Sequence, residues 1–246
     1  FSGLKMRRFV RILTAECLQI AKEEVRDQLK DYFKKSGFSK AVIGLSGGID
    51  SSLTACIASE ALGNENVIGI SMPSEYSSEH SKTDARDLAN NLGIEFQSIA
   101  IGDIFNDMLD NMDAFFKDTP TGIAEENLQA RIRGNILMSV SNKIGALVLN
   151  TGNKTELALG YCTMYGDMCG ALGVISDINK LQVYEISRWI NESKSSTMIP
   201  ENAICKKPSA ELKEKMERVL GLGTGVETAS PKSNTFDAPF DGGKPM

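Results

Sequence analysis

The sequence predicts an α/β fold, a doubly wound parallel sheet with helices on both faces. Short apolar runs rich in β-branched residues alternate with longer segments of helical spacing, which is the order of repeated β-α-β units. The chain has 246 residues, of which 41% are hydrophobic and 24% charged, enough for one such domain with a full core. Because crossovers between parallel strands are right-handed, helices are expected on both faces of the sheet.

The pattern begins with a helix expected at residues 14–35. Its apolar side chains recur at helical spacing, and Gly37 follows its end. A buried strand is expected at residues 41–45, where an apolar run contains β-branched residues. The next helix is expected at residues 51–62, and Gly63 stops it. These three segments form the start of the first β-α-β unit.

The same alternation continues in the middle of the chain. A second strand is expected at residues 67–72, where Pro73 ends the apolar run. A helix is expected at residues 81–92, with Gly93 directly behind it. A third strand is expected at residues 96–101. Loops that leave the carboxyl ends of such strands face one ligand-binding edge of an open parallel sheet.

The last third of the pattern contains helices at residues 104–116 and 125–144, a buried strand at 146–149 and a helix at 183–190. From residue 221 onward the chain is rich in glycine, proline, serine and threonine and has no periodicity. We therefore expect one domain over residues 1–220 and an irregular tail over residues 221–246.

The bulk chemistry argues against several classes of protein. The formal net charge is −5 and the pI is about 5.1, so neither nucleic acid nor a membrane surface is an expected partner. No apolar run approaches the roughly 20 residues of a membrane span, and the start of the chain lacks a signal-peptide cleavage site. Five widely spaced cysteines without a C-x-x-C motif disfavour disulfides and zinc. We expect a cytoplasmic protein.

The segment SGGIDSS, at residues 46–52, has the chemistry of a phosphate site. Gly47 and Gly48 allow a positive φ and let an anion approach the backbone closely. The helix that follows would add free N–H groups and its dipole. The hydroxyls of Ser46, Ser51 and Ser52 could donate hydrogen bonds to the same oxygens. The alternative is a plain tight turn between a strand and a helix.

Asp50 lies within this segment, and a carboxylate repels phosphates unless a cation lies between them. Asp50 is therefore expected to bind Mg²⁺, with capping of the helix as the alternative. The lysine of the Walker motif G-x-x-x-x-G-K-[ST] is absent here. SGGIDS instead resembles the pyrophosphate loop of the N-type ATP pyrophosphatases, which adenylate a substrate with ATP. This resemblance implies an adenine nucleotide alpha hydrolase-like fold.

Four longer motifs resemble those of the NAD⁺ synthetase family, in family order. They are MPSEYSSEHSKTDARDLANNLGI (72–94), AEENLQARIRG (124–134), LNTGNKTELALGYCTMYGDMCG (149–170) and KKPSAEL (206–212). The residues of these motifs are more similar to the synthetase part of glutamine-dependent members than to ammonia-dependent members. The resemblance implies a C–N ligase that converts nicotinic acid adenine dinucleotide (deamido-NAD) to NAD⁺. The pyridine carboxylate would attack the α-phosphate of ATP, and ammonia would displace AMP from the acyl-adenylate.

The resemblance also implies roles for individual residues. Asp50, Glu156 and Lys180 would be catalytic, and Asp50 and Glu156 would bind Mg²⁺. The residues implied to bind ATP, the co-substrate, are Ser46, Gly47, Gly48, Asp50, Ser51, Ser52, Thr151, Lys180 and Ser209. Those implied to bind deamido-NAD are Asn127, Arg131 and Asp167. The family is commonly homodimeric, and the helices at 14–35 and 125–144 are candidate interface elements.

Each of these residues also has a structural interpretation. Arg131 could be an ordinary charge on a helix face, Asp167 could cap a glycine-rich turn, and Lys180 could be a plain surface lysine. Tyr161 and Tyr165 could stack on a pyridine ring or simply pack in the rim of the core. The resemblance to the family motifs favours the functional roles of Arg131, Asp167 and Lys180.

The resemblance ends after KKPSAEL. Residues 213–220, KEKMERVL, follow directly where the family usually has a polar, glutamine-bearing loop. Either the closing loop is shorter here or a stretch is missing, and the role of Ser209 depends on which. The sequence DMCGAL also lacks the aspartate of the ammonia-type DGGAD. The nitrogen donor is either free ammonia or ammonia that another domain releases from glutamine.

Two other functions use the same loop. A tRNA-modifying thiolase would share the adenylation chemistry, but it would require paired cysteines and a basic surface, neither of which the sequence shows. A non-catalytic ATP sensor would bind nucleotide without needing both Asp50 and Glu156. Release of AMP that depends on deamido-NAD distinguishes the synthetase from both.

Overall fold

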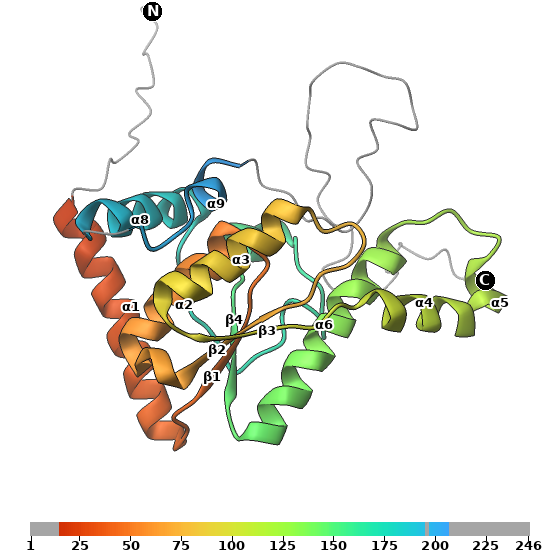
Figure 1. Ribbon diagram of the computed structural model, residues 1–246, viewed down its shortest axis with the longest axis horizontal. Helices are drawn as coiled ribbons and strands as arrows, with labels where there is room; N and C mark the ends of the chain where they lie inside the picture. Colours follow the sequence, from red (N-terminus) through yellow and green to blue (C-terminus); the bar gives the residue numbers. More distant parts are fainter. Residues whose placement is uncertain (1–14, 195–196, 207–246) are drawn as a thin grey trace, which may run out of the picture.

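The structure is a computed structural model that describes residues 15–194 and 197–206 (Figure 1). Within these residues, parallel strands form one sheet in the order β3-β2-β1-β4-β5. The strands are β1 (Ala41–Gly44), β2 (Val67–Ser71), β3 (Glu95–Ser98), β4 (Leu147–Asn150) and β5 (Leu172–Gly173). The predicted doubly wound parallel sheet is confirmed.

Helices cover both faces of this sheet, as Figure 1 shows. One apolar core lies between the sheet and α1, α2, α3, α8 and α9, and a second lies between the sheet and α4 and α6. The helices are α1 (Ala15–Ser36), α2 (Ile49–Leu62), α3 (Glu79–Leu92), α4 (Gly102–Asn111), α5 (Asp113–Phe116), α6 (Ile123–Ile144), α7 (Lys154–Leu159), α8 (Lys180–Ser193) and α9 (Glu201–Cys205), with a 3₁₀ turn η1 (Asn64–Asn66).

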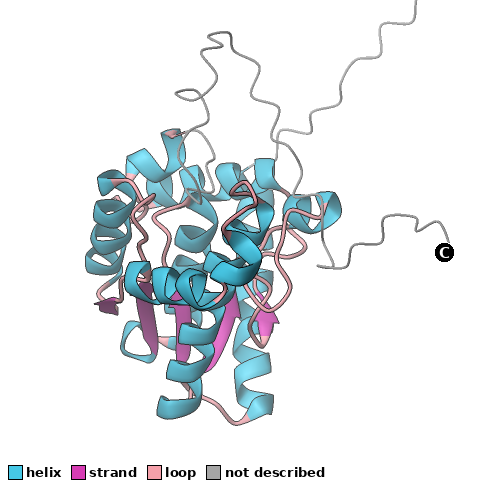
Figure 2. Ribbon diagram, turned by 90° about the vertical axis from the view of Figure 1, so that its right-hand side faces the viewer, coloured by secondary structure: helices cyan, strands magenta, loops and turns pink. Residues whose placement is uncertain are grey.

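The strand order reverses at β1, which pairs with β2 on one side and with β4 on the other. Ala41 lies in register with Val67 of β2 and with Leu147 of β4. The chain winds outward from β1 through β2 to β3 and then returns to β4. At such a switch point, the loops that follow the two central strands diverge and leave room for a ligand. Figure 2 shows the strands side by side, with most loops at one end of them.

Helix α2 is buried along nearly its whole length between the sheet and the helices α1, α3 and α8. This explains its sequence, IDSSLTACIASEAL, which is apolar or small on all sides rather than amphipathic. Small side chains such as Ala55 and Ala58, both fully buried, let the neighbouring elements approach closely. The helix therefore holds a fixed position, with its N-terminus at the carboxyl end of β1.

A partly buried ion pair fixes the other end of α2. Lys22 of α1 donates to Glu60 of α2, with 2.7 Å between Nζ and Oε2, and its ammonium lies 5.3 Å from the ring centre of Trp189 in α8. Burial alone would raise the pKa of Glu60, but the hydrogen bonds from Lys22 and Arg26 lower it overall. These contacts join three helices on one face of the sheet.

Most predicted elements are present, with ends shifted by a few residues. The helix expected at residues 104–116 is wrong as a single element, because it is interrupted at Met112, where α4 ends and α5 begins. The short elements α7, β5 and α9 were not predicted. The proposed tail at residues 221–246 lies outside the described residues. No helix in residues 15–194 and 197–206 is long and apolar enough to cross a membrane.

Candidate functional site

The turn between β1 and α2 packs directly on the first turn of α3. Gly47 has φ +73°, in the left-handed region, and a Cβ built on it would lie 2.2 Å from the carbonyl oxygen of Ser81. Gly48 caps α2 without any side-chain hydrogen bond to the helix. The first N–H groups of α2 therefore remain available at the carboxyl end of the sheet. The positive end of the helix dipole lies at the same place, and both favour an anion.

The serine hydroxyls of this turn have different roles. Ser51 and Ser52 are buried, and both donate to the carbonyl oxygen of Gly48, over 3.0 and 2.8 Å. Ser46 is exposed, and its Oγ accepts from the N–H of Gly48 and lies 3.2 Å from Oγ of Ser51. All three serines thus help to shape the turn, and Ser46 is the exposed one.

The carboxylate of Asp50 is held from two directions. Asn153, which follows β4, donates from Nδ2 to Oδ1 of Asp50 over 2.9 Å, and Lys180 of α8 donates to Oδ2. The ammonium of Lys180 also lies 3.9 Å from Oε1 of Glu156 in α7. Three predicted residues from three parts of the chain, Asp50, Glu156 and Lys180, therefore meet at the switch point.

Asn153 is a site residue that the sequence reasoning missed. It is fully buried, and its Oδ1 accepts from the N–H groups of Thr155 and Glu156, so it caps α7. The carboxylate of Glu156 accepts from the N–H of Asn153 in return, which completes a capping box. The pattern N-x-x-E within NKTE is the sequence signal for this motif. It orients Glu156 toward Asp50.

The pair Asp50 and Glu156 is suited to share a cation. Burial raises the pKa of Glu156, and the negative charge of Asp50 raises it further, while Lys180 and the N–H of Asn153 oppose the shift. No group of three or more metal-binding side chains occurs in the described part of the chain. Mg²⁺ is usually bound by one or two protein carboxylates, while phosphates and water supply its other oxygen ligands. Two carboxylates are therefore enough for such a site.

A second group of predicted residues meets through Thr163, which is fully buried. Its hydroxyl donates to Oδ1 of Asn127 over 2.8 Å, and its N–H donates to Oδ1 of Asp167 over 2.6 Å. The turn-capping role considered for Asp167 is therefore present. Asn127 lies on α6, and Arg131 follows it one turn later on the same helix, half-buried. Thr163 carries no sequence signal that would have identified it.

The loop that carries Asp167 lies tightly on α6. A Cβ at Gly134 would approach the carbonyl oxygens of Tyr165 and Gly166 to 2.8 and 2.9 Å, and one at Gly166 would lie 2.9 Å from the backbone of Ala130. Tyr165 has φ +61°, which is uncommon for a residue other than glycine, and its side chain is 73% exposed. Such strain is typical of functional segments.

Asn150, at the end of β4, connects the two groups. Its Nδ2 donates to the carbonyl oxygens of Asp167 and Cys169, over 2.5 and 3.3 Å, and its Oδ1 accepts from the N–H of Gly152. Burial raises the pKa of Tyr161, and the charges of Glu126 and Glu156 add to the shift. Asn150 therefore joins the loop of Asp167 to the segment that leads to Asn153.

The structure brings together the three loops that follow β1, β2 and β4. Asp50 and Asn153 join the first and third, and Gly47 and Ser81 join the first and second. Thr151 lies directly after β4. Ser209 lies outside the described residues.

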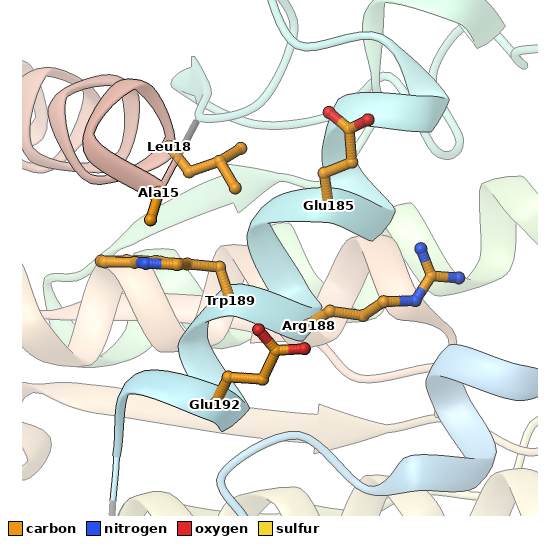
Figure 3. A pocket seen from close by; sticks show the side chains of 6 residues that line it. All are labelled: Ala15, Leu18, Glu185, Arg188, Trp189 and Glu192. Atoms are coloured by element: carbon orange, nitrogen blue, oxygen red, sulfur yellow. The ribbon is translucent and has the colours of Figure 1, made fainter. Parts of the chain in front are cut away.

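A groove elsewhere contains none of the predicted site residues. It has a volume of about 270 Å³ and lies between α1 and α8, with the ring of Trp189 directed toward Ala15 (Figure 3). Its lining residues are Ala15, Leu18, Glu185, Arg188, Trp189 and Glu192. The switch point, rather than this groove, is the candidate functional site.

Known protein sequences resemble this chain over most of its length. Residues 21–224 match the model of the family described as NAD synthase. A glutamine-dependent NAD(+) synthetase of Synechocystis sp. is 59% identical over 183 residues, which cover 74% of this chain and 32% of that protein. The enzyme of the same name from Thermotoga maritima is 56% identical over 185 residues, with 75% and 32% covered. The chain thus spans about a third of the length of these relatives.

Solved structures give the same result. A glutamine-dependent NAD⁺ synthetase of Acinetobacter baumannii, in complex with ADP, superposes with a TM-score of 0.76 at 42% identity, covering 79% of this chain and 37% of that one. An NH₃-dependent NAD synthetase of Campylobacter jejuni has a TM-score of 0.68 at 33% identity, with 76% of each chain covered. An NMN synthetase of Francisella tularensis has a TM-score of 0.72 at 27% identity, covering 84% of this chain and 82% of that one.

Proposed function

Since this chain belongs to the NAD synthase family, we propose that it catalyses the ATP-dependent amidation of deamido-NAD to NAD⁺ and releases AMP and pyrophosphate. The observation that carries the proposal is the meeting of Asp50, Glu156 and Lys180 beside the N-terminus of α2. Such a site combines an anion-binding helix end with paired carboxylates and a lysine. Phosphoryl chemistry on a metal-bound nucleotide needs these groups.

The N-terminus of α2 would receive the β- and γ-phosphates of ATP. The amide groups of its first turn are not covered by a capping side chain, and Gly47 leaves the backbone open to a close approach. Because α2 is buried between the sheet and other helices, these donors are fixed before ATP binds. Fixed donors stabilise negative charge on the departing pyrophosphate without reorganisation in the transition state.

Asp50 and Glu156 would hold Mg²⁺, whose charge would offset that of the triphosphate. The ammonium of Lys180 already lies between these carboxylates, so it neutralises part of their charge. It is also close enough to the α2 N-terminus to act as a point charge on the phosphates. The positive charge of Lys180 would thus be neutralised either by the carboxylates or by phosphate oxygens.

The reaction would consist of two displacements without a covalent enzyme intermediate. A carboxylate oxygen of deamido-NAD attacks the α-phosphorus of ATP, the bond to the bridging oxygen breaks, and its electron pair leaves with pyrophosphate. Ammonia then attacks the carbonyl carbon of the acyl-adenylate, AMP departs, and the extra proton is lost. The protein would contribute alignment and charge, so its cysteines need not take part.

The group around Thr163 would bind deamido-NAD. Asn127, Arg131 and Asp167 are the proposed contacts, and Asn150 joins their loop to the ATP side. We further propose a homodimer, with α1 and α6 as candidate interface helices, and no nucleic-acid or membrane partner. A cytoplasmic location accords with the absence of disulfides among the cysteines of the described residues. Whether the ammonia is free or comes from glutamine would be decided by assays with each donor.

The deciding experiment measures AMP released from Mg-ATP by the full chain. Deamido-NAD and ammonium are each present or omitted, and nicotinic acid mononucleotide and tRNA replace the dinucleotide in parallel reactions. The proposal expects AMP and NAD⁺ in equal amounts only with ATP, deamido-NAD and ammonium together. AMP formed with the mononucleotide or with tRNA alone would assign a different substrate, and ATP binding without turnover would indicate a sensor.

A further inference from the structure

A charged cluster outside the proposed catalytic groups joins α9 to the first turns of α3. Lys206, directly after α9, donates from Nζ to Oγ of Ser81 over 2.9 Å, and the same nitrogen lies 3.7 Å from Oδ2 of Asp84. Asn202 donates to that Asp84 oxygen over 2.7 Å. Asp84 is 7% exposed, and Lys206 and Asn202 both face its Oδ2.

The position of Lys206 is not explained by helix stability. A cation beside the N-terminal turn of α3 opposes the helix dipole, which favours anions there. The buried carboxylate of Asp84 compensates for this. The other side of the cluster is rigid, because Ala203 and Ile204 of α9 are buried in the core. Lys206 therefore connects a fixed helix to Ser81.

Ser81 is the residue on which the Gly47 turn packs. Its carbonyl oxygen would lie 2.2 Å from a Cβ at Gly47, so there is little space between α3 and the turn. A shift of the first turn of α3 would therefore move, or release, the backbone of Gly47. The hydroxyl of the same Ser81 is the group that Lys206 holds.

We propose that Lys206 and Asp84 are positioning residues, which hold the first turn of α3 against Gly47 and so keep the phosphate-binding turn in its binding geometry. The inference rests on the proposed function, because it assigns the turn to the triphosphate. Lys206 contacts Ser81, and Ser81 is the residue on which the turn packs. Their loss should weaken binding of ATP while leaving the chemical step, carried by other groups, nearly unchanged.

The test compares Lys206→Met with Lys82→Met in the full chain. Lys82 pairs with Glu79 on the exposed side of the same part of α3, so its substitution is a matched loss of charge outside the cluster. For Lys206→Met we expect the Kd and the KM for Mg-ATP to rise about tenfold, with kcat within about twofold. Lys82→Met should leave all three values unchanged, and Lys206→Arg should restore most of the affinity.

A second variant keeps the test independent of folding. Ser81→Ala removes the hydroxyl that Lys206 holds, which also accepts from the hydroxyl of Ser78, and it should raise the Kd in the same direction. Adding Asp84→Asn to Lys206→Met should cause less than the sum of the separate losses, since both remove one interaction. An unchanged Kd in Lys206→Met, or a fall in kcat at constant KM, would overturn the proposal. The Kd comparison by calorimetry needs no turnover, so it separates this inference from the proposed reaction.

Discussion

Asn153 donates a hydrogen bond to Asp50 over 2.9 Å, although these residues follow different strands and lie 103 positions apart. The other side of the same amide caps α7. One buried side chain therefore fixes both the orientation of Asp50 and the helix that carries Glu156. The separation of the two carboxylates depends on this contact.

Asn153→Asp should separate these two functions. The aspartate keeps an oxygen for the cap of α7, but it replaces the donor to Asp50 with a negative charge. We expect a loss of stability of about 1 to 3 kcal/mol at neutral pH and a much larger loss of turnover. Urea unfolding and the AMP assay measure the two effects. Full turnover in the variant would show that the contact does not orient Asp50.

Asp50→Asn should reduce turnover far more than stability. The amide can still accept from Asn153, and Lys180 keeps Glu156 within reach at 3.9 Å. We expect turnover to fall about 100-fold or more, with a change of about 1 kcal/mol in the free energy of unfolding. Proportionate losses of both would instead make Asp50 a structural cap of α2.

Glu156 should make stability depend on pH in an unusual direction. Burial, and then the charge of Asp50, raise its pKa, so the folded protein disfavours its ionised form. Its contribution is fully present below the unfolded value of about 4.3 and is lost as the pH rises through the folded pKa. Compared with the wild type, Glu156→Gln should therefore gain stability between pH 4 and pH 7, measured by urea unfolding at each pH.

Glu79→Gln is the matched control for this pH series. Glu79 accepts a hydrogen bond from Lys82 that lowers its pKa, so its contribution is present above the unfolded pKa and is lost as the pH falls. The stability difference between this variant and the wild type should change with pH in the opposite direction, and weakly, because the pair is exposed. Parallel curves for the two variants would contradict the assignment for Glu156.

Gly47→Ala should cost more than the same change at Gly37. Both glycines have a positive φ, +73° and +76°, but only a Cβ at Gly47 meets another group, the carbonyl of Ser81. We expect a loss of about 1 kcal/mol for Gly37→Ala from backbone strain alone, and about 3 kcal/mol for Gly47→Ala. ATP binding should be lost only in Gly47→Ala. Equal losses of stability would mean that α3 can shift to make room for the added methyl group.

Gly134→Ala should affect the dinucleotide and spare ATP. Its methyl group would displace the backbone at Tyr165 and Gly166, and with it the loop of Asp167. We expect the KM for deamido-NAD to rise about tenfold while the KM for ATP stays constant. Ser139→Ala, on an exposed position of the same helix, is the control. A rise in the KM for ATP alone would contradict the division of the site into two groups.

The main elements of the fold could be predicted from sequence because strands and long helices differ in length and periodicity. The features that were not predicted were missed for physical reasons. β5 has two residues and α7 has six, too few to show a period, although the capping box of Asn153 and Glu156 could have indicated α7. The break at Met112 lies in a segment whose helical spacing continues across it, so periodicity could not locate it.

Less of the site could be predicted. Loops at the ends of parallel strands meet, so sequence placed the regions around Asp50 and Glu156 at one edge. The partners of those residues depend on tertiary contacts. Nothing in the sequence indicates that Ser51 and Ser52 donate to Gly48, that Thr163 joins Asn127 to Asp167, or that Lys206 reaches Ser81.

The burial of α2 on all sides has a consequence for amide hydrogen exchange. Its inner N–H groups are hydrogen-bonded and remote from water, so they should exchange only when the whole domain unfolds. The N–H groups of its first turn have no intrahelical acceptor and face the sheet edge, and a bound anion would slow them selectively. A single helix would then report both global opening and occupancy by nucleotide, in one deuterium-labelling experiment.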